Sequence, residues 1–299
     1  MENRAAAMTV VIPSVNGPDD LRACLDALAG EAGTVSLEVL LPERCGDAVR
    51  GIVQRDYPWV RVIPVETTTT IPAMRAVAFR AATAEVVAVI EDHVIVPAGW
   101  AQRLLTAIHG GAHVVGGSIE NAATGTLVDR AAFLCEYSHC LRLPAGRVDW
   151  LVGNNVAYRR ETLEQFRDVY DAGDWETRLH EAMRRRGIDL ICRPEIVVGH
   201  RKHYSIHSYV EQRYLYARSY AGARIAHAAW PRRLAYAVGS LALPALLFPR
   251  IAARVLRGTG DGMLLLQCSP LIMVFVIAWA WGEVVGSALG AGDALQRVC

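Results

Sequence analysis

Short apolar runs of strand length alternate with segments of helical spacing through the first two thirds of this 299-residue chain. Between the runs, Leu21, Cys24, Leu25 and Leu28 share one face of a predicted helix, and Pro72 stands at the start of another. The alternation predicts an α/β fold with a mostly parallel twisted sheet flanked by helices. The strand-like runs are residues 9–14, 37–42, 60–65, 86–90 and 111–118.

Polar residues follow several of these runs. In parallel sheets, ligands bind at the carboxyl ends of the strands. Burying carboxylates and an imidazole is costly unless they are paired or bound to metal, so the acidic tripeptide in this set indicates either a metal site or a solvated strand end. No GxGxxG or GxxxxGK[ST] motif is present, which argues against dinucleotide and P-loop sites. The residues at the predicted strand ends are Ser14, Asn16, Glu43 and the tripeptide Glu91-Asp92-His93.

The charge and cysteine counts exclude some classes of protein. Lys and Arg number 31 against 30 Asp and Glu, so no overall field favours a nucleic-acid partner. The seven cysteines are scattered without a CxxC pair, which argues against a disulfide framework or zinc ribbon and favours a reducing compartment.

The composition changes near Trp230, where two apolar blocks begin. The first, Leu234–Pro249, has no charge, and the second, Leu264–Gly290, carries only Glu283. The second block is long enough to cross a bilayer at roughly 20 residues per span. The first is short, and either spans in an extended form or lies as a re-entrant or interfacial arm. We therefore expect a membrane-embedded helical hairpin with membrane lipids as partners.

The residues before these blocks are basic and rich in tyrosine. Residues 204–233 resemble an interfacial helix that favours anionic membrane surfaces, although an ordinary amphipathic helix has the same pattern. Arginines stand on both sides of the first block, which argues against translocation of either end. The expected organisation is a tail at 1–7, an α/β domain at 8–203, the interfacial helix at 204–233, and the membrane-embedded hairpin and tail at 234–299.

An ordered set of motifs runs from Met8 to Arg224: VVIPSVNG, LEVLLPE, AMRAVAFRAA, the acidic strand end, GNNVAYRRE and DWE. The set resembles the inverting nucleotide-sugar glycosyltransferases of the GT-A fold, of the family 2 type. The resemblance implies transfer of a sugar from a nucleoside diphosphate sugar to an acceptor hydroxyl. With the apolar blocks, it favours a lipid-linked or membrane-proximal glycan acceptor in polysaccharide or glycolipid biosynthesis. The expected location is a prokaryotic inner membrane, with the catalytic domain cytoplasmic.

The resemblance also suggests a metal centre. The family's Asp-x-Asp motif is replaced here by Glu91-Asp92-His93, which is similar to the Asp-x-His form of polypeptide N-acetylgalactosaminyltransferases. By that analogy Glu91 and His93 are metal ligands, His200 completes the site, and Asp92 faces the donor ribose or sugar. A carboxylate with imidazoles suits Mn²⁺ better than Mg²⁺, which prefers oxygen ligands and water.

The same resemblance assigns residues to the donor. Arg44 replaces the second aspartate of the family's pair, and an arginine cannot accept a hydrogen bond, so the nucleotide base stays open with a lean to uracil. Two arginines, Arg213 and Arg218, are candidates to close over the donor diphosphate. They could instead contact lipid phosphates. The remaining donor-binding candidates are Pro13, Ser14, Asn16, Glu43, Arg75 and Asp92.

The DWE segment supplies the candidate general base, Asp174, which would take the proton of the acceptor hydroxyl. The preceding family glutamate is Gly173 here, so Asp171 and Glu176 are alternatives. Asp174 also fits a second interpretation as the cap of a helix beginning at Trp175. The residues that the resemblance places around the sugar and acceptor are Trp150, Asn154, Asn155, Trp175 and Glu176.

Two other functions share parts of this pattern. A membrane-anchored nucleotidyltransferase has a similar sheet and acidic edge, but it needs an early basic phosphate loop that SVNGPDD lacks. A catalytically degenerate module that binds a nucleotide sugar as a scaffold is compatible with Arg44 and Gly173.

Overall fold

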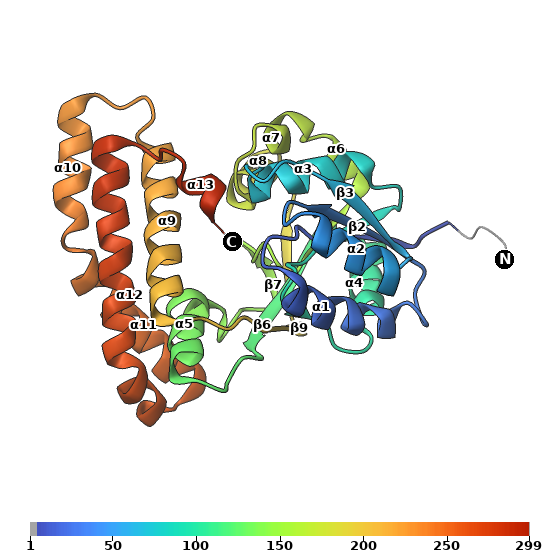
Figure 1. Cartoon of the computed structure of the whole chain (residues 1–299), viewed down its shortest axis with the longest axis horizontal. Helices are drawn as coiled ribbons and strands as arrows, with labels where there is room; N and C mark the ends of the chain where they lie inside the picture. The colour runs from blue at the N-terminus through green and yellow to red at the C-terminus, as the bar shows by residue number, and fades with distance from the viewer. Residues whose placement is uncertain (1–4, 299) are drawn as a thin grey trace. The chain divides into compact units, whose positions relative to one another are not determined.

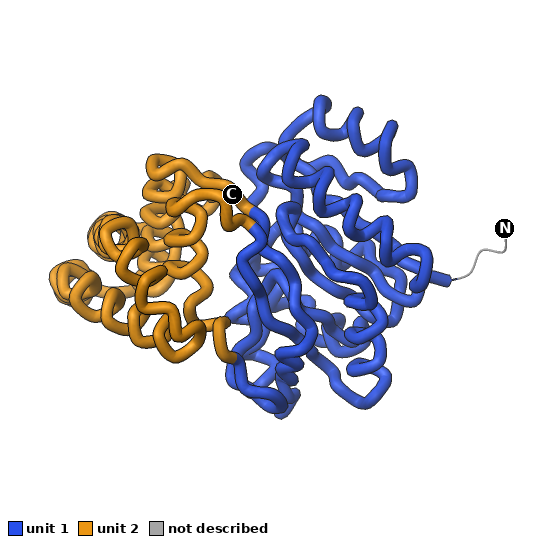
Figure 2. Tube along the Cα trace, turned by 90° about the horizontal axis from the view of Figure 1, so that it is seen from below, with its two compact units in different colours: residues 1–122, 143–201 blue, residues 123–142, 202–299 orange. Residues whose placement is uncertain are grey.

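The structure, a computed structural model, describes residues 5–298. The first four residues of the predicted 1–7 tail and Cys299 lie outside the described residues. The chain forms two compact units (Figure 2). We call Met1–Ala122 with Leu143–Arg201 the sheet unit, and Ala123–Arg142 with Lys202–Cys299 the helical unit. The change of unit after Arg201 lies close to the boundary expected at residue 203, whereas the sequence pattern did not indicate that residues 123–142 join the helical unit.

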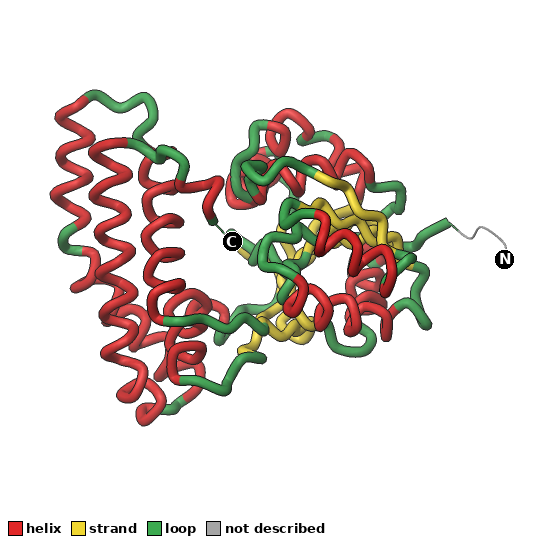
Figure 3. Tube along the Cα trace, viewed as in Figure 1, coloured by secondary structure: helices red, strands yellow, loops and turns green. Residues whose placement is uncertain are grey.

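The strands of the described chain all belong to the sheet unit and form one sheet (Figure 3). A strand overlaps each of the apolar runs that the sequence indicates, and this confirms the α/β class. The strands are β1 (Met8–Val11), β2 (Leu37–Glu43), β3 (Val60–Pro64), β4 (Val86–Val89), β5 (Val94–Ile95), β6 (Val114–Asn121), β7 (Gly146–Val148), β8 (Val156–Arg159) and β9 (Leu190–His200).

The sheet is mixed, with the strand order β3-β2-β1-β4-β8-β6-β9-β5 and β7 paired to β9. The pairs β3-β2, β2-β1, β1-β4 and β6-β9 are parallel. The pairs β4-β8, β8-β6, β9-β5 and β7-β9 are antiparallel. The expected parallel arrangement therefore holds for β1 to β4, and β8 inserts in the opposite direction. A short apolar run predicts a strand but not its direction.

The ends of several strands lie together at one edge of the sheet. Val11 of β1 lies beside Val89 of β4, and Val89 pairs with Val156, the first residue of β8. On the far side of β8, Asn121 at the end of β6 pairs with His200 at the end of β9. The loops after β1 and β4, the loop before β8 and the end of β9 therefore meet at this edge.

Helices flank the sheet (Figure 1). One core cluster joins α3 and α8 to the strands through Phe79, Val89, Tyr158, Leu179 and Met183. Thr70 caps α3, its side chain accepting a hydrogen bond from the Ala73 amide. The helices of the sheet unit are α1 (Pro18–Glu31), α2 (Asp47–Asp56), α3 (Ile71–Ala81), α4 (Trp100–His109), α6 (Arg160–Glu164), α7 (Arg167–Asp171) and α8 (Glu176–Arg185).

The helical unit is built around α12, which packs against α5, α9, α10 and α11. α9 and α12 approach so closely that a Cβ on Gly282 would lie 2.3 Å from the Tyr214 carbonyl oxygen, and one on Gly286 would lie 2.5 Å from that of Arg218. Small residues are needed for such close packing. The helices of this unit are α5 (Leu127–Tyr137), the 3-10 turn η1 (Ser138–Cys140), α9 (Ile206–Arg224), α10 (Trp230–Ser240), α11 (Leu243–Thr259), α12 (Gly262–Leu289) and α13 (Ala294–Arg297).

The two apolar blocks take different forms in this unit. Within the described residues, α12 is the one helix that is long and apolar enough to cross a membrane. The first block is divided between α10 and α11, which pass the same test only as a pair and are bent by 51° at their junction. One such helix is weak evidence for a membrane span. The single carboxylate of the second block, Glu283, is buried and accepts two hydrogen bonds from Arg224.

Candidate metal and donor site

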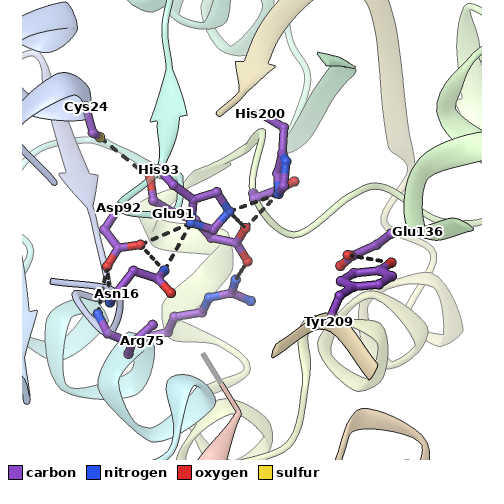
Figure 4. A network of polar contacts seen from close by, with 11 residues as sticks. Asn16, Cys24, Arg75, Glu91, Asp92, His93, Glu136, His200 and Tyr209 are labelled. Atoms are coloured by element: carbon purple, nitrogen blue, oxygen red, sulfur yellow. Dashed lines mark hydrogen bonds and ion pairs between the residues drawn. The ribbon is translucent and has the colours of Figure 1, made fainter. Parts of the chain in front are cut away.

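Three potential metal ligands meet at the edge of the sheet where β4 and β9 end. One ligand atom from each of Glu91, His93 and His200 lies within 4.8 Å of the others. His93 Nε2 is 2.9 Å from His200 Nε2 and 3.3 Å from Glu91 Oε2 (Figure 4). Ligand atoms around an octahedral ion with bonds of about 2.1 Å are roughly 3 Å apart, so this spacing fits one divalent metal ion.

The charges around Glu91 keep it ionised. Burial alone would raise the pKa of its carboxyl, but the hydrogen bond and charge of His93, with the charges of Arg75 and His200, hold that pKa far below its usual range. Asn154 Nδ2 donates a further hydrogen bond of 2.9 Å to Glu91 Oε2. The set therefore presents one carboxylate and two imidazoles, a mixed oxygen and nitrogen donor set of the kind that divalent transition metals accept.

Asp92, the middle residue of the tripeptide, is fully buried and is not one of these three ligand groups. Its Oδ2 accepts hydrogen bonds from the Val15 and Asn16 amides, at 2.7 and 2.9 Å. Its Oδ1 accepts one from Asn16 Nδ2 at 2.6 Å and lies 3.1 Å from His93 Nδ1. These contacts give Asp92 two structural tasks, and its contact with the donor ribose or sugar stays a prediction. Asp92 fixes the turn after β1, and it orients the His93 ring.

We expect Asp92→Asn to weaken metal binding by roughly 10- to 100-fold, the usual effect of losing the partner that orients a ligand histidine. The substitution keeps the size of the side chain and removes its charge. The measurement is a Mn²⁺ titration followed by electron paramagnetic resonance, with Asp56→Asn as the control because Asp56 pairs with arginines far from this edge. Unchanged Mn²⁺ affinity would show that Asp92 does not support His93.

Arg75, on α3, joins the candidate metal ligands to the DWE segment. Its guanidinium is buried, with NH1 2.6 Å from Glu176 Oε2 and NH2 3.6 Å from Glu91 Oε1. The guanidinium carbon also lies 6.0 Å from the centre of the Trp175 ring. Arg75 Nε is buried and has no hydrogen-bond partner among the described residues. This arrangement places a fixed positive charge, with a donor to spare, beside the three ligands.

The three carboxylates of the DWE region have different surroundings. Asp171 pairs with Arg80. Asp174 is exposed and, within the described residues, has no hydrogen bond or ion pair. It does not cap α8, because Trp175 occupies the N-cap position and no side chain caps the helix there. Glu176 packs so tightly over the GNN loop that a Cβ on Gly153 would meet its carboxyl carbon at 2.3 Å. Asp174 and Glu176 line one small pocket of about 20 Å³ with Arg75.

The predicted sugar and acceptor residues divide into two groups. Asn154 contacts Glu91, and Trp175 and Glu176 contact Arg75, so these three lie at the site. Asn155 is fully buried, and its amide accepts from the Trp100 indole and donates to the carbonyls of Ser118 and Ile196. These bonds give Asn155 a structural role at the irregular pairing of β6 and β9.

Trp150, the other predicted sugar contact, lines a second pocket of the sheet unit. This pocket has a volume of about 290 Å³ and apolar walls from Leu143, Val148 and Val152. Trp150 is partly exposed there. Arg147 and Asp149 also line this pocket, so it combines apolar walls and an indole face with charged groups.

The predicted nucleotide residues lie at the ends of β1 and β2. Pro13, Ser14 and Asn16 form the turn after β1, and Ser14 bridges to Glu43. The Ser14 hydroxyl is buried and lacks a hydrogen-bond partner among the described residues. Glu43 is fully buried and already accepts hydrogen bonds from the Gly46 amide and from Arg50. Glu43 therefore has fewer free acceptor positions for a nucleoside than the sequence implies.

The two arginines predicted to close over a diphosphate make contacts within the helical unit. The Arg213 guanidinium lies 4.1 Å from the centre of the Trp279 ring on α12. Arg218 Nε donates to the Gly290 carbonyl at 3.3 Å, at the end of α12. Both side chains hold α9 against α12.

A buried histidine on α8, hydrogen-bonded to the Tyr158 that lines the small pocket, was not among the residues predicted from the sequence. His180 Nε2 lies 2.8 Å from the Tyr158 hydroxyl, and burial lowers the pKa of His180 to about 4. Burial also raises the pKa of Tyr158. At neutral pH both groups are uncharged, and Tyr158 lines the small pocket together with Glu176 and Arg75. The spacing of His180 four residues after Glu176 on α8 was the available clue.

The depressed pKa of His180 predicts a pH effect on stability. Unfolded chains bind a proton at this residue with a pKa near 6.5, so folding loses stability as the pH falls from about 6.5 to about 4. At pH 5 the loss is about 2 kcal/mol relative to pH 7. His180→Gln keeps a polar partner for Tyr158 without titrating. We expect urea unfolding of this variant to depend less on pH, by about this amount, and an unchanged pH dependence would contradict the assignment.

The fold and the site together agree with the GT-A arrangement that the motifs imply, and comparisons with known proteins bear this out. The sequence model of "Glycosyl transferase family 2" matches residues 9–167. The chain therefore belongs to glycosyltransferase family 2, and it is a glycosyltransferase. Among curated proteins no match was found.

Solved structures show the same fold. A mannosyltransferase from Pyrobaculum calidifontis, in complex with GDP-mannose and Mn²⁺, superposes with a TM-score of 0.57 at 20% identity, covering 93% of this chain and 87% of that one. TarS residues 1–349 of S. aureus, in complex with UDP-GlcNAc, superposes with a TM-score of 0.52 at 13% identity, covering 86% and 68%. At these identities the likeness establishes the fold.

Proposed function

We propose that the chain transfers a sugar, with inversion, from a nucleoside diphosphate sugar to a hydroxyl of a lipid-linked or membrane-proximal glycan. The observation that carries the proposal is the cluster of Glu91, His93 and His200 at the carboxyl edge of the sheet, linked by Arg75 to Glu176. Such a cluster combines a site for a cation with a carboxylate a few ångströms away. Inverting transfer needs these two functions together.

The metal would be held by Glu91, His93 and His200. Their spacing fits a single ion, and their two imidazoles favour Mn²⁺ over Mg²⁺. When bound, such an ion neutralises the negative charge that develops on a leaving diphosphate. The Mn²⁺ in the Pyrobaculum complex is consistent with this choice.

Arg75 is the residue best placed to contact the donor diphosphate. It is buried, positively charged and keeps one unused N–H donor. The turn formed by Pro13, Ser14 and Asn16 would line the nucleotide pocket, with the Ser14 hydroxyl as a free polar group. Asp92 would act indirectly, since its oxygens hold this turn in place.

For the general base, the geometry favours Glu176 over the predicted Asp174. Glu176 lies over Gly153 and shares Arg75 with the metal ligand Glu91, whereas Asp174 is exposed at the edge of the pocket. Asp171 is less favoured, because it pairs with Arg80 and does not line the pocket that Asp174 and Glu176 share. When a donor diphosphate shares the charge of Arg75, the Glu176 carboxylate is released to accept the proton of the acceptor hydroxyl. Asp174 stays as the alternative base.

The acceptor and location follow from other parts of the chain. The apolar pocket beside Trp150 suits an acceptor with an apolar portion. The apolar helices with their arginines suit association with membrane lipids, as in a prokaryotic inner membrane with the site on the cytoplasmic side. Together these features favour a role in polysaccharide or glycolipid biosynthesis.

The proposal is tested by binding and by product stereochemistry. A thermal-shift panel of UDP- and GDP-sugars, with and without Mn²⁺, should show a donor that raises the melting temperature mainly when Mn²⁺ is present. Proton NMR of the product should then show an inverted anomeric centre. Binding without any turnover would favour a nucleotide-sugar-binding scaffold. Stabilisation by nucleoside triphosphates and not by diphosphate sugars would favour a nucleotidyltransferase.

A further inference from the structure

The helical unit exposes a long apolar stripe on α12. The stripe follows Met263, Leu266, Val274, Ile277 and Trp281, at intervals that place them on one side of the helix. Met263 and Trp281 are 63% and 59% exposed, as much as polar surface residues usually are. The opposite side of α12, with Phe275, Gly282 and Gly286, is the side buried against α9.

A second stripe lies on α10, which packs against α12 (Figure 1). Trp230, Leu234 and Val238 on α10 and Leu241 directly after it recur every three or four residues and are all exposed, whereas Ala237 is buried. Soluble proteins rarely expose contiguous apolar surface on neighbouring elements unless a membrane or a partner covers it. The two stripes therefore require an apolar environment outside the unit.

The packing of α12 argues against a full span of the bilayer. Phe275 contacts Tyr209 of α9, with ring centres 4.5 Å apart, and Trp279 lies under Arg213. If α12 crossed a membrane, the same stretch of α9 would have to enter the hydrocarbon core with Glu211 and Arg213. Charged groups at that depth cost several kcal/mol each. The close contacts at Gly282 and Gly286 show that α9 packs directly against this stretch of α12.

The positive charge of the helical unit indicates which kind of surface covers its apolar stripes. Between residues 212 and 260 the sequence has eight arginines and no Asp or Glu. Among these arginines, Arg232, Arg250, Arg254 and Arg257 are exposed, next to the exposed stripes or between them in sequence. Anionic lipid headgroups attract such segments by about 1 kcal/mol per arginine near the surface. A second copy of the chain, which carries the same positive charge here, would be repelled.

We propose that the helical unit binds one leaflet of an anionic bilayer as an interfacial unit, and that α12 lies in the membrane surface without crossing it. The apolar stripes of α10 and α12 enter the outer part of the acyl region, to a depth of about 5–10 Å. The polar side chains of α9 stay at the level of the headgroups or outside them. Every residue that supports the membrane surface belongs to the helical unit, so this proposal does not depend on the chemistry of the metal and donor site.

The topology of α12 provides the first test. Gly262→Cys and Leu289→Cys place thiols at its two ends and off the apolar stripe, about 40 Å apart along the helix and farther apart than the roughly 30 Å hydrocarbon core. Both are made in the full chain with Cys45→Ser and Cys299→Ser, and membranes of defined sidedness are treated with an impermeant maleimide. We expect both positions to react from the same side. Reaction from opposite sides would show that α12 spans the membrane and overturn the proposal.

Vesicle flotation of the purified chain provides the second test. The chain should float with vesicles that contain phosphatidylglycerol, bind phosphatidylcholine vesicles at least tenfold less, and dissociate as salt rises. The double variant Ile277→Ser/Trp281→Ser should lower the bound fraction by about tenfold or more. Trp59→Ser, in the sheet unit, is the matched control and should bind normally. Absence of vesicle binding, or a dimer that the double variant dissociates, would refute the lipid surface and assign the stripes to a protein interface.

Discussion

His93→Ala is expected to lower kcat/KM for sugar transfer by about a thousandfold or more. His93 is the central member of the candidate metal site, with its Nε2 within 3.3 Å of both other ligand groups. Loss of the imidazole removes one metal ligand, Nε2, which lies between the ligand atoms of Glu91 and His200. The effect should exceed the 10- to 100-fold that follows from loss of an orienting partner such as Asp92.

The measurement is release of the nucleoside diphosphate at increasing Mn²⁺, with Mn²⁺ binding followed separately by electron paramagnetic resonance. His200→Ala should behave as His93→Ala does. His109→Ala is the matched control, since His109 is exposed at the end of α4 and is not one of the three clustered ligand groups. A His93→Ala enzyme with normal Mn²⁺ affinity and turnover would remove the cluster from the mechanism.

Glu176→Gln is expected to lower kcat by about a hundred- to ten-thousandfold, the range that general base catalysis supplies. The amide keeps the shape of the side chain and a hydrogen bond to Arg75, but it cannot take a proton from the acceptor hydroxyl. Donor affinity, measured by calorimetry with Mn²⁺, should change by only a few fold. Asp174→Asn should reduce kcat by a few fold at most, because Asp174 is exposed and makes no ion pair or hydrogen bond within the described chain.

Other outcomes for these two variants would assign the carboxylates different roles. If Asp174→Asn carries the large loss and Glu176→Gln does not, the base is Asp174, as the DWE motif alone predicts. If both variants lose donor binding equally with turnover, the two carboxylates act on the structure of the pocket. Asp171→Asn is the matched control for both, as its partner Arg80 lies outside the pocket lining.

The order of elements in the sheet unit could be predicted from the sequence because apolar runs and helical spacing are local signals. The direction of β8 could not, since it depends on pairing with β4 and β6, strands that are distant in sequence. The sequence also could not predict that α5 belongs to the helical unit. This membership rests on packing against α12, more than 120 residues away.

The site shows the same division between local and distant information. Side-chain alternation at the end of β4 is enough to separate Glu91 and His93 from Asp92, and the structure gathers Glu91, His93 and His200 as the resemblance implies. The partner of Asp92 is a turn 76 residues earlier in the chain, so no local pattern could show it. The choice among Asp171, Asp174 and Glu176 likewise depends on Arg80, Arg75 and Gly153, which the sequence does not place.

The central claim is a metal-dependent transfer at this cluster. It is tested most directly by turnover of the donor that the thermal-shift panel selects, measured in the wild-type chain with Mn²⁺, with EDTA, and after Mn²⁺ is restored. We expect release of nucleoside diphosphate with Mn²⁺, loss of that activity in EDTA, and its recovery when Mn²⁺ is added back. Full activity in EDTA would contradict the claim.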